Sequence, residues 1–190
     1  LGAFVFAKML TLGINPLLAM LASFLAGGLG GYITYVLFRK FKIQAILAGI
    51  LTMTFLYSVN LRITNTPNIT FFDYKTVFQL FESLPKIFIL GLMTLMIKLA
   101  LDWFLKTEKG YLLLATGDNE ALVKSLGKNP DKYIAMGLII SNALAGLAGA
   151  LMAQSNGYAD ITMGQAIIVS ALASVIIGDA FLKNANFLNR

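Results

Sequence analysis

The residues that could carry chemistry are gathered in one polar segment, 106–132, of an otherwise apolar chain. Within it, Gly117-Asp118-Asn119 has the composition of a turn, and Asp118 is a good helix N-cap because its carboxylate can accept from first-turn amides. Residues 120–126 favour a helix, which Gly127 can end in the left-handed conformation. The segment is longer than the two to eight residues that usually join neighbouring helices. We therefore expect a surface helix of about two turns, either a plain amphipathic helix or one that binds a partner.

The sequence excludes several kinds of catalytic and metal site. It has no cysteine and no histidine, which removes thiolate and imidazole metal ligands, disulfides and Ser-His or Cys nucleophiles. A phosphate-binding loop needs Gly-x-x-x-x-Gly-Lys-Ser/Thr. The candidate Gly127-Lys128 fails this pattern, because position 122 is Leu and position 129 is Asn. We therefore predict no metal site, no ATP site and no enzymatic activity in this chain.

The elements that must position this segment are membrane-spanning helices. Only 13% of the 190 residues are charged and 58% are hydrophobic, with a mean hydropathy of +0.78, whereas about a quarter of the residues in soluble domains are charged. A helix needs about 20 apolar residues to cross a bilayer, and lipid leaves no partner for the backbone of other structures. The predicted spans are 16–38, 43–61, 85–105, 131–153 and 163–182, and the apolar stretch 1–12 is a partial span. We predict an all-α, polytopic membrane helix bundle.

The basic residues orient these spans. The positive-inside rule places 106–130 in the cytoplasm and 64–83 outside, since the inner segments then hold ten Lys or Arg residues and the outer segments three. The net charge of +6 is thus a topology signal and gives no reason to expect nucleic-acid binding. In the external segment, Tyr74, Val77, Phe78 and Phe81 share one helical face. They predict an interfacial helix that anchors in the headgroup layer or docks an external partner.

Small and polar residues within the spans indicate packing and a solute pathway. Small residues four apart let helices approach closely, within the chain or at a dimer seam, and the candidates are Gly27, Gly31, Ala145, Gly146 and Gly149. Polar side chains at membrane depth line a pathway or hydrogen-bond between helices, and these candidates are Thr52, Thr54, Ser58, Asn60 and Asn142. Lys98 and Asp102, four apart on one helix near its inner end, are expected to pair with each other or to extend toward the membrane interface.

The polar segment also resembles a known family. Residues 120–127, with Glu-Ala first and Gly last, resemble the EAA-type loop of ABC importer permeases, although the Ile-x-Leu-Pro that often follows the glycine is missing. The chain as a whole is similar to the permeases for branched-chain amino acids and ribose, and most similar to an amino-acid subgroup associated with tryptophan and tyrosine. The stretches that carry this resemblance are 115–121, 126–129, 143–151, 47–54, 157–160 and 163–164.

The resemblance implies a function and partners. The short helix would be a coupling helix seated in a cleft of a cytoplasmic ATP-binding subunit, which holds the ATP and Mg²⁺; this chain binds no cofactor. Ala121 would face a tight contact there, and Glu120 would stabilise the helix start or pair with a basic group of the partner. The coupling-loop residues are Gly117, Asp118, Asn119, Glu120, Ala121, Lys124, Ser125, Leu126 and Gly127.

The other implied partners are an extracytoplasmic solute-binding protein, a second permease copy and membrane lipid. Residues 1–190 would be one transmembrane permease domain, truncated at both ends, in the bacterial inner membrane. It would import a small polar solute, an amino acid, by alternating access. Two alternatives stay open from the residues: an ion-coupled secondary transporter, which would show inverted repeats, broken helices and acidic ion sites, and a membrane scaffold that transports nothing.

Overall fold

The computed structural model describes residues 1–74, 76–80, 85–164, 170, 173–174 and 176–178. The chain divides into two compact units, Leu1–Ala159 and Asp160–Arg190. In the described part of the second unit, the Asp160 carboxylate accepts from the Thr162 amide at 2.8 Å, and Ser174 Oγ donates to the Ser170 carbonyl at 2.8 Å. The predicted span 163–182 lies mostly outside the described residues.

Four predicted spans are confirmed as helices long and apolar enough to cross a membrane. They are α2 (Pro16–Tyr35), which continues as the π-helix η1 (Val36–Lys40), α3 (Ala45–Thr64), α5 (Lys86–Leu105) and α8 (Pro130–Asn156). The helix starts follow local chemistry. The side chains of Asn15 and Asn129 accept from the amides of Leu17 and Asp131, each at 2.9 Å, before a proline at the first helical position.

The remaining described elements are short. The partial span is the helix α1 (Gly2–Thr11), and the other short helices among the described residues are α4 (Val77–Leu80), α6 (Glu108–Asp118) and α7 (Glu120–Ser125). The strands β1 (Asn68–Thr70) and β2 (Tyr158–Asp160) pair in a two-stranded sheet. This sheet is an addition to the predicted all-α fold, and it joins segments too far apart in sequence for local patterns to reveal.

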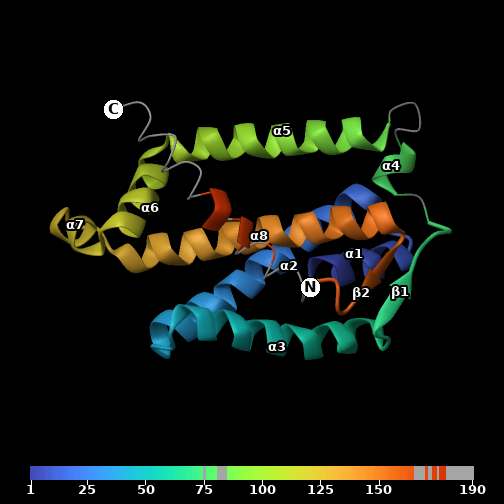
Figure 1. Cartoon of the computed structure of the whole chain (residues 1–190), viewed down its shortest axis with the longest axis horizontal. Coiled ribbons are helices and arrows are strands. Elements are labelled where there is room, and N and C mark those ends of the chain that lie inside the picture. The colour runs from blue at the N-terminus through green and yellow to red at the C-terminus, as the bar shows by residue number, and fades with distance from the viewer. Residues whose placement is uncertain (75, 81–84, 165–169, 171–172, 175, 179–190) are drawn as a thin grey trace. The chain divides into compact units, whose positions relative to one another are not determined.

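The core of the first unit is the crossing of α2 with α8, against which α1 also packs (Figure 1). Small residues bring these backbones together. A Cβ atom at Gly27 would overlap the Asn142 carbonyl oxygen, and one at Gly31 would overlap the Leu138 carbonyl oxygen. Packing of this kind drives helix association in lipid, where apolar surface gains nothing by burial against another helix.

Helix α5 has the surface expected of a lipid-facing span. Ile89 is its single buried residue, and its apolar side chains are otherwise exposed or half-buried, with Ile87 and Trp103 the most exposed. A helix that is apolar all round and bare of protein suits a hydrocarbon environment. The predicted pair on α5 is confirmed, with Lys98 Nζ 3.6 Å from Asp102 Oδ2.

The segment 64–83, predicted to be external, differs from its predicted structure. In place of an interfacial helix, the described residues form the single turn α4, whose Val77 and Phe78 are buried within the protein. Val77 donates its amide to the Gln154 side chain at 3.0 Å, and Phe71 packs edge-on against Phe6 with ring centroids 5.8 Å apart. These contacts come from α1 and α8, so the aromatic pattern reflects tertiary packing. Phe81, the last member of the predicted face, lies outside the described residues.

Candidate functional site

The polar segment folds into two helices, α6 and α7, where the sequence predicted one. Helix α6 was not predicted, and its last two residues, Gly117 and Asp118, were assigned to a turn. Its last residue is Asp118, so the predicted N-cap is wrong: Asn119 has the extended backbone that a cap requires. The Asn119 side chain accepts from the amides of Ala121 at 2.9 Å and Leu122 at 3.3 Å.

The end of α7 matches its prediction. Gly127 has φ +71°, the left-handed conformation that glycine adopts without strain. Its amide donates to the Lys124 carbonyl at 2.9 Å, and the Lys128 amide donates to the Val123 carbonyl at 3.2 Å. These two bonds form a complete Schellman motif. Caps at both ends therefore fix the backbone of this six-residue helix.

One side of α7 is seated on the protein and the other is bare. Val123 is fully buried, whereas Leu122 and Leu126 are 50% and 59% exposed, and Ala121 is exposed too. Helix α7 packs against α6 and α8, and an ion pair of 3.2 Å between Lys128 and Glu108 links the end of the segment to the start of α6. Helix α7 therefore has an exposed face that carries two leucine side chains.

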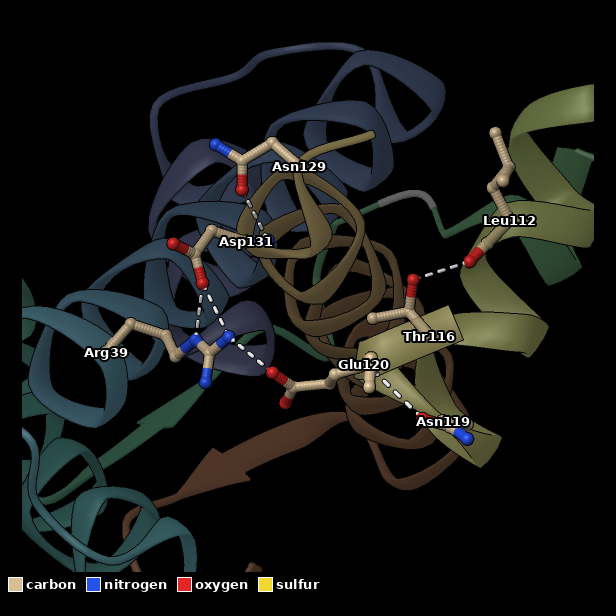
Figure 2. Close-up of polar contacts among 8 residues, drawn as sticks. Arg39, Leu112, Thr116, Asn119, Glu120, Asn129 and Asp131 are labelled. Carbon is tan, nitrogen blue, oxygen red and sulfur yellow. Dashed lines mark hydrogen bonds and ion pairs between the residues drawn. The ribbon is translucent and has the colours of Figure 1, made fainter. Parts of the chain in front are cut away.

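Arg39 joins three elements at this end of the molecule. Figure 2 shows its guanidinium between two carboxylates. Nε and one terminal nitrogen lie 2.6 Å from Asp131 Oδ1, and the same terminal nitrogen lies 2.9 Å from Glu120 Oε2. We call these three residues the Arg39 clasp. It connects η1, the first residue of α7 and the second residue of α8.

The clasp adds a partner to the interpretation of Glu120. This carboxylate lies in the first turn of α7, where the helix dipole was expected to stabilise it. Its ion pair is with Arg39 of the same chain, where a basic group of a partner was the expected alternative. Asp131, in the first turn of α8, is the second acceptor. Arg39 is one of the ten basic residues that orient the predicted spans. The partners lie 81 and 92 residues from Arg39, so no local spacing marks them.

A groove of about 450 Å³ opens beside the clasp. It lies between the end of the α2–η1 segment and the starts of α3 and α8, and contains none of the predicted pathway residues. The lining residues are Phe38, Arg39, Lys42, Ile43, Gln44, Lys124, Asn129, Pro130 and Asp131.

The predicted packing residues fall into two groups. Gly27, Gly31 and Gly146 lie at the crossing of α2 and α8, where a Cβ atom at Gly146 would be 2.5 Å from the Ser23 carbonyl oxygen. Gly149 is looser, since its added Cβ would be 3.5 Å from the Ala3 amide nitrogen. Ala145 is exposed and does not take part in this crossing. Gly2 was missed, although a Cβ atom there would overlap the Gly146 carbonyl oxygen.

The predicted pathway residues are not gathered in one place. Thr52 is buried and accepts from Thr34 Oγ1 at 3.0 Å, an interhelical bond. Asn142 donates to the Leu138 carbonyl of its own helix at 2.9 Å, and Asn60 is buried. Thr54 and Ser58 are exposed. Thr52 and Asn142 therefore have structural partners, and a role in lining a pathway stays a prediction for all five.

The sequence is similar to those of known transport proteins. A family model described as the permease component of the branched-chain amino acid transport system matches residues 1–185. The chain belongs to this permease family. The four apolar helices accordingly identify an integral membrane protein, and the predicted relationship to ABC importer permeases is confirmed.

Individual relatives of the permease differ in their solutes. It is 43% identical over 188 residues to a tyrosine transport system permease of Clostridioides difficile, covering 99% of this chain and 63% of that protein. It is 29% identical to a ribose import permease of Haemophilus influenzae, covering 93% and 56%. A probable branched-chain amino acid permease of Methanocaldococcus jannaschii is 28% identical, with coverage of 93% and 61%. No solved structure gave a significant match.

Proposed function

We propose that the permease imports an amino acid across the cytoplasmic membrane of a bacterium, with tyrosine as the first solute to test. The identity of 43% to a tyrosine permease, against 29% to a ribose permease, favours an aromatic amino acid. The chain spans 63% of the length of the tyrosine permease, so this activity is proposed for the whole protein of which the chain forms part.

The energy for import comes from a separate ATP-binding subunit that docks on α7. The observation that carries this assignment is the construction of α7, which is capped at both ends, seated through Val123 and bare at Leu122 and Leu126. A short rigid helix with an exposed apolar face can transmit a displacement without deforming. ATP and Mg²⁺ belong to that partner, and the permease itself is not an enzyme.

The remaining partners follow from importer architecture. An extracytoplasmic binding protein delivers the solute, a second permease copy completes the pathway, and lipid surrounds the spans; nucleic acid has no role. When the ATPase subunits close, α7 is displaced. Since α7 packs against α6 and α8, and α6 against α5, the displacement tilts α5 and α8 and alternates access to the solute.

Transport by the reconstituted system tests this function. The intact permease, its ATPase and its binding protein would be placed in proteoliposomes, and uptake of labelled tyrosine would be followed. We expect accumulation that requires both ATP and the binding protein, that persists when proton and sodium gradients are dissipated, and that is lost with an ATPase variant unable to hydrolyse ATP.

Other outcomes would identify the alternatives. Uptake driven by an ion gradient without ATP would make the protein a secondary transporter. ATP-driven uptake of ribose and not of amino acids would overturn the solute class. No uptake of any solute, together with no ATPase in the purified complex, would leave a membrane scaffold.

A further inference from the structure

The two carboxylates of the Arg39 clasp are held in place by their own helices. Glu120 begins α7, directly after the cap Asn119, and Asp131 follows the cap Asn129 in the first turn of α8. Carboxylates at helix N-termini are stabilised by the backbone dipoles. Arg39 reaches them from η1, a π-helical turn that extends α2. The planar guanidinium can bind two carboxylates at once, which a lysine ammonium does less precisely.

The clasp connects α7 to the α2–η1 segment, which is not among the elements that α7 mainly packs against. Along the chain α7 is joined to α6 and α8, and its packing is against the same two helices. Among hydrogen bonds between described residues, Arg39 with Glu120 is the one that joins the α2–η1 segment to α7. Arg39 also binds Asp131 of α8, whose backbone contacts α2 through Gly27 and Gly31.

Solvent exposure argues against a role in stability alone. The side chains of Arg39, Glu120 and Asp131 are 24%, 40% and 48% exposed, and exposed ion pairs contribute little to folding. A contact of this kind can still fix the relative position of two helices, since its geometry involves two bonds to one carboxylate and one to the other. We therefore expect loss of the clasp to affect the transmission of movement from α7 to α2 more than the stability of the fold.

We propose that Arg39 is a positioning residue that makes α7 move as one body with the α2–α8 pair. A displacement of α7 by the ATPase then reaches α2 directly, in addition to the helices that adjoin α7 in sequence. This inference rests on the proposed docking of the ATPase on α7. It adds a third spanning helix to the route by which ATP hydrolysis alternates access.

Neutral variants of the clasp test this role in the reconstituted transporter. We expect Arg39→Gln and Glu120→Gln each to leave membrane insertion and ATPase co-purification unchanged. Each should lower the stimulation of ATP hydrolysis by loaded binding protein at least about fivefold, the lower end of usual coupling effects. The double variant should lose no more than Arg39→Gln alone, because that variant already removes the contact with Glu120. The matched control is Lys128→Gln, which removes the 3.2 Å ion pair with Glu108 and should keep full stimulation.

A covalent link separates mechanical from purely electrostatic or folding effects. The chain has no cysteine, so Arg39→Cys with Glu120→Cys can be joined by a short bifunctional thiol reagent, and we expect stimulation to return on cross-linking. Normal stimulation in both neutral variants, additive losses, or no recovery on cross-linking would overturn the clasp. Loss of ATPase binding in Glu120→Gln would overturn it too, by assigning Glu120 to the partner. If the unmodified complex shows no ATP-driven uptake, the proposed function fails instead.

Discussion

Replacing Gly27 with alanine strongly destabilises the permease, whereas the same change at Gly49 leaves stability unchanged. The Cβ atom at position 27 would overlap the Asn142 carbonyl oxygen and lie 3.0 Å from the Gly146 Cα atom. Both neighbours are backbone, so α2 and α8 must move apart and lose contacts along their crossing. Overpacking of this kind costs about 1–3 kcal/mol. Among the residues that the structure describes, none outside the helix backbone around Gly49 has an atom within 4 Å of a Cβ atom placed there.

Thermal unfolding of the intact permease in detergent measures this difference. Gly31→Ala should behave like Gly27→Ala, because its Cβ atom would overlap the Leu138 carbonyl oxygen. Gly28→Ala is the matched control beside Gly27, since its Cβ atom would be 3.4 Å from Ile139 Cγ2, an ordinary contact. Equal melting temperatures for the Gly27, Gly28 and Gly49 variants would show that the close crossing of α2 and α8 does not exist.

Ala121→Trp and Gly127→Val abolish coupling while the permease still inserts and folds. Ala121 is exposed in the chain, so an indole there should change stability by no more than about 0.5 kcal/mol. It would nevertheless collide with an ATPase docked on α7. Gly127 has a φ of +71°. A residue with a Cβ atom adopts this left-handed backbone conformation at a cost of about 1–2 kcal/mol. Valine at this position would therefore distort the backbone where α7 ends.

Three separate readouts make this prediction sharp: membrane insertion, co-purification of the ATPase, and stimulation of ATP hydrolysis by loaded binding protein. We expect the first to persist and at least one of the others to fall about tenfold, the effect of about 1.4 kcal/mol at an interface. Ala121→Ser keeps a small side chain, and Gly127→Asn has a residue that tolerates the left-handed conformation. Both should couple normally. Full coupling in the tryptophan and valine variants would contradict a docked α7.

The spans could be predicted from sequence because their length and apolarity are fixed locally. The predicted 85–105 and the observed Lys86–Leu105 differ by one residue, since Pro85 has an extended backbone and is the N-cap of the helix. The predicted end of α8 was three residues short. The helix continues through Gln154 to Asn156 and ends at Gly157, which has φ +76°. The left-handed Gly127 was predictable for the same local reason.

The Arg39 clasp and the contacts of Phe71 were not predictable, because the residues that they bring together are distant in sequence. Nothing near Arg39 indicates that its guanidinium meets Glu120 and Asp131. Likewise the Phe71 amide donates to the Gly157 carbonyl at 3.0 Å, a contact between residues 86 positions apart that no local pattern predicts. The choice of Asn119 over Asp118 as the cap depends on where α6 ends, and α6 itself was missed.

Cross-linking from α7 to the ATPase tests the central claim most directly. In the intact transporter, single cysteines would be introduced as Leu122→Cys on the exposed face of α7 and as Thr70→Cys on β1, an exposed position, and each would be treated with a short thiol-to-amine reagent. We predict a covalent product between the ATPase and the Leu122→Cys permease, and none with Thr70→Cys. A product with Thr70→Cys and none with Leu122→Cys would contradict both the docking of the ATPase on α7 and the cytoplasmic position of that helix.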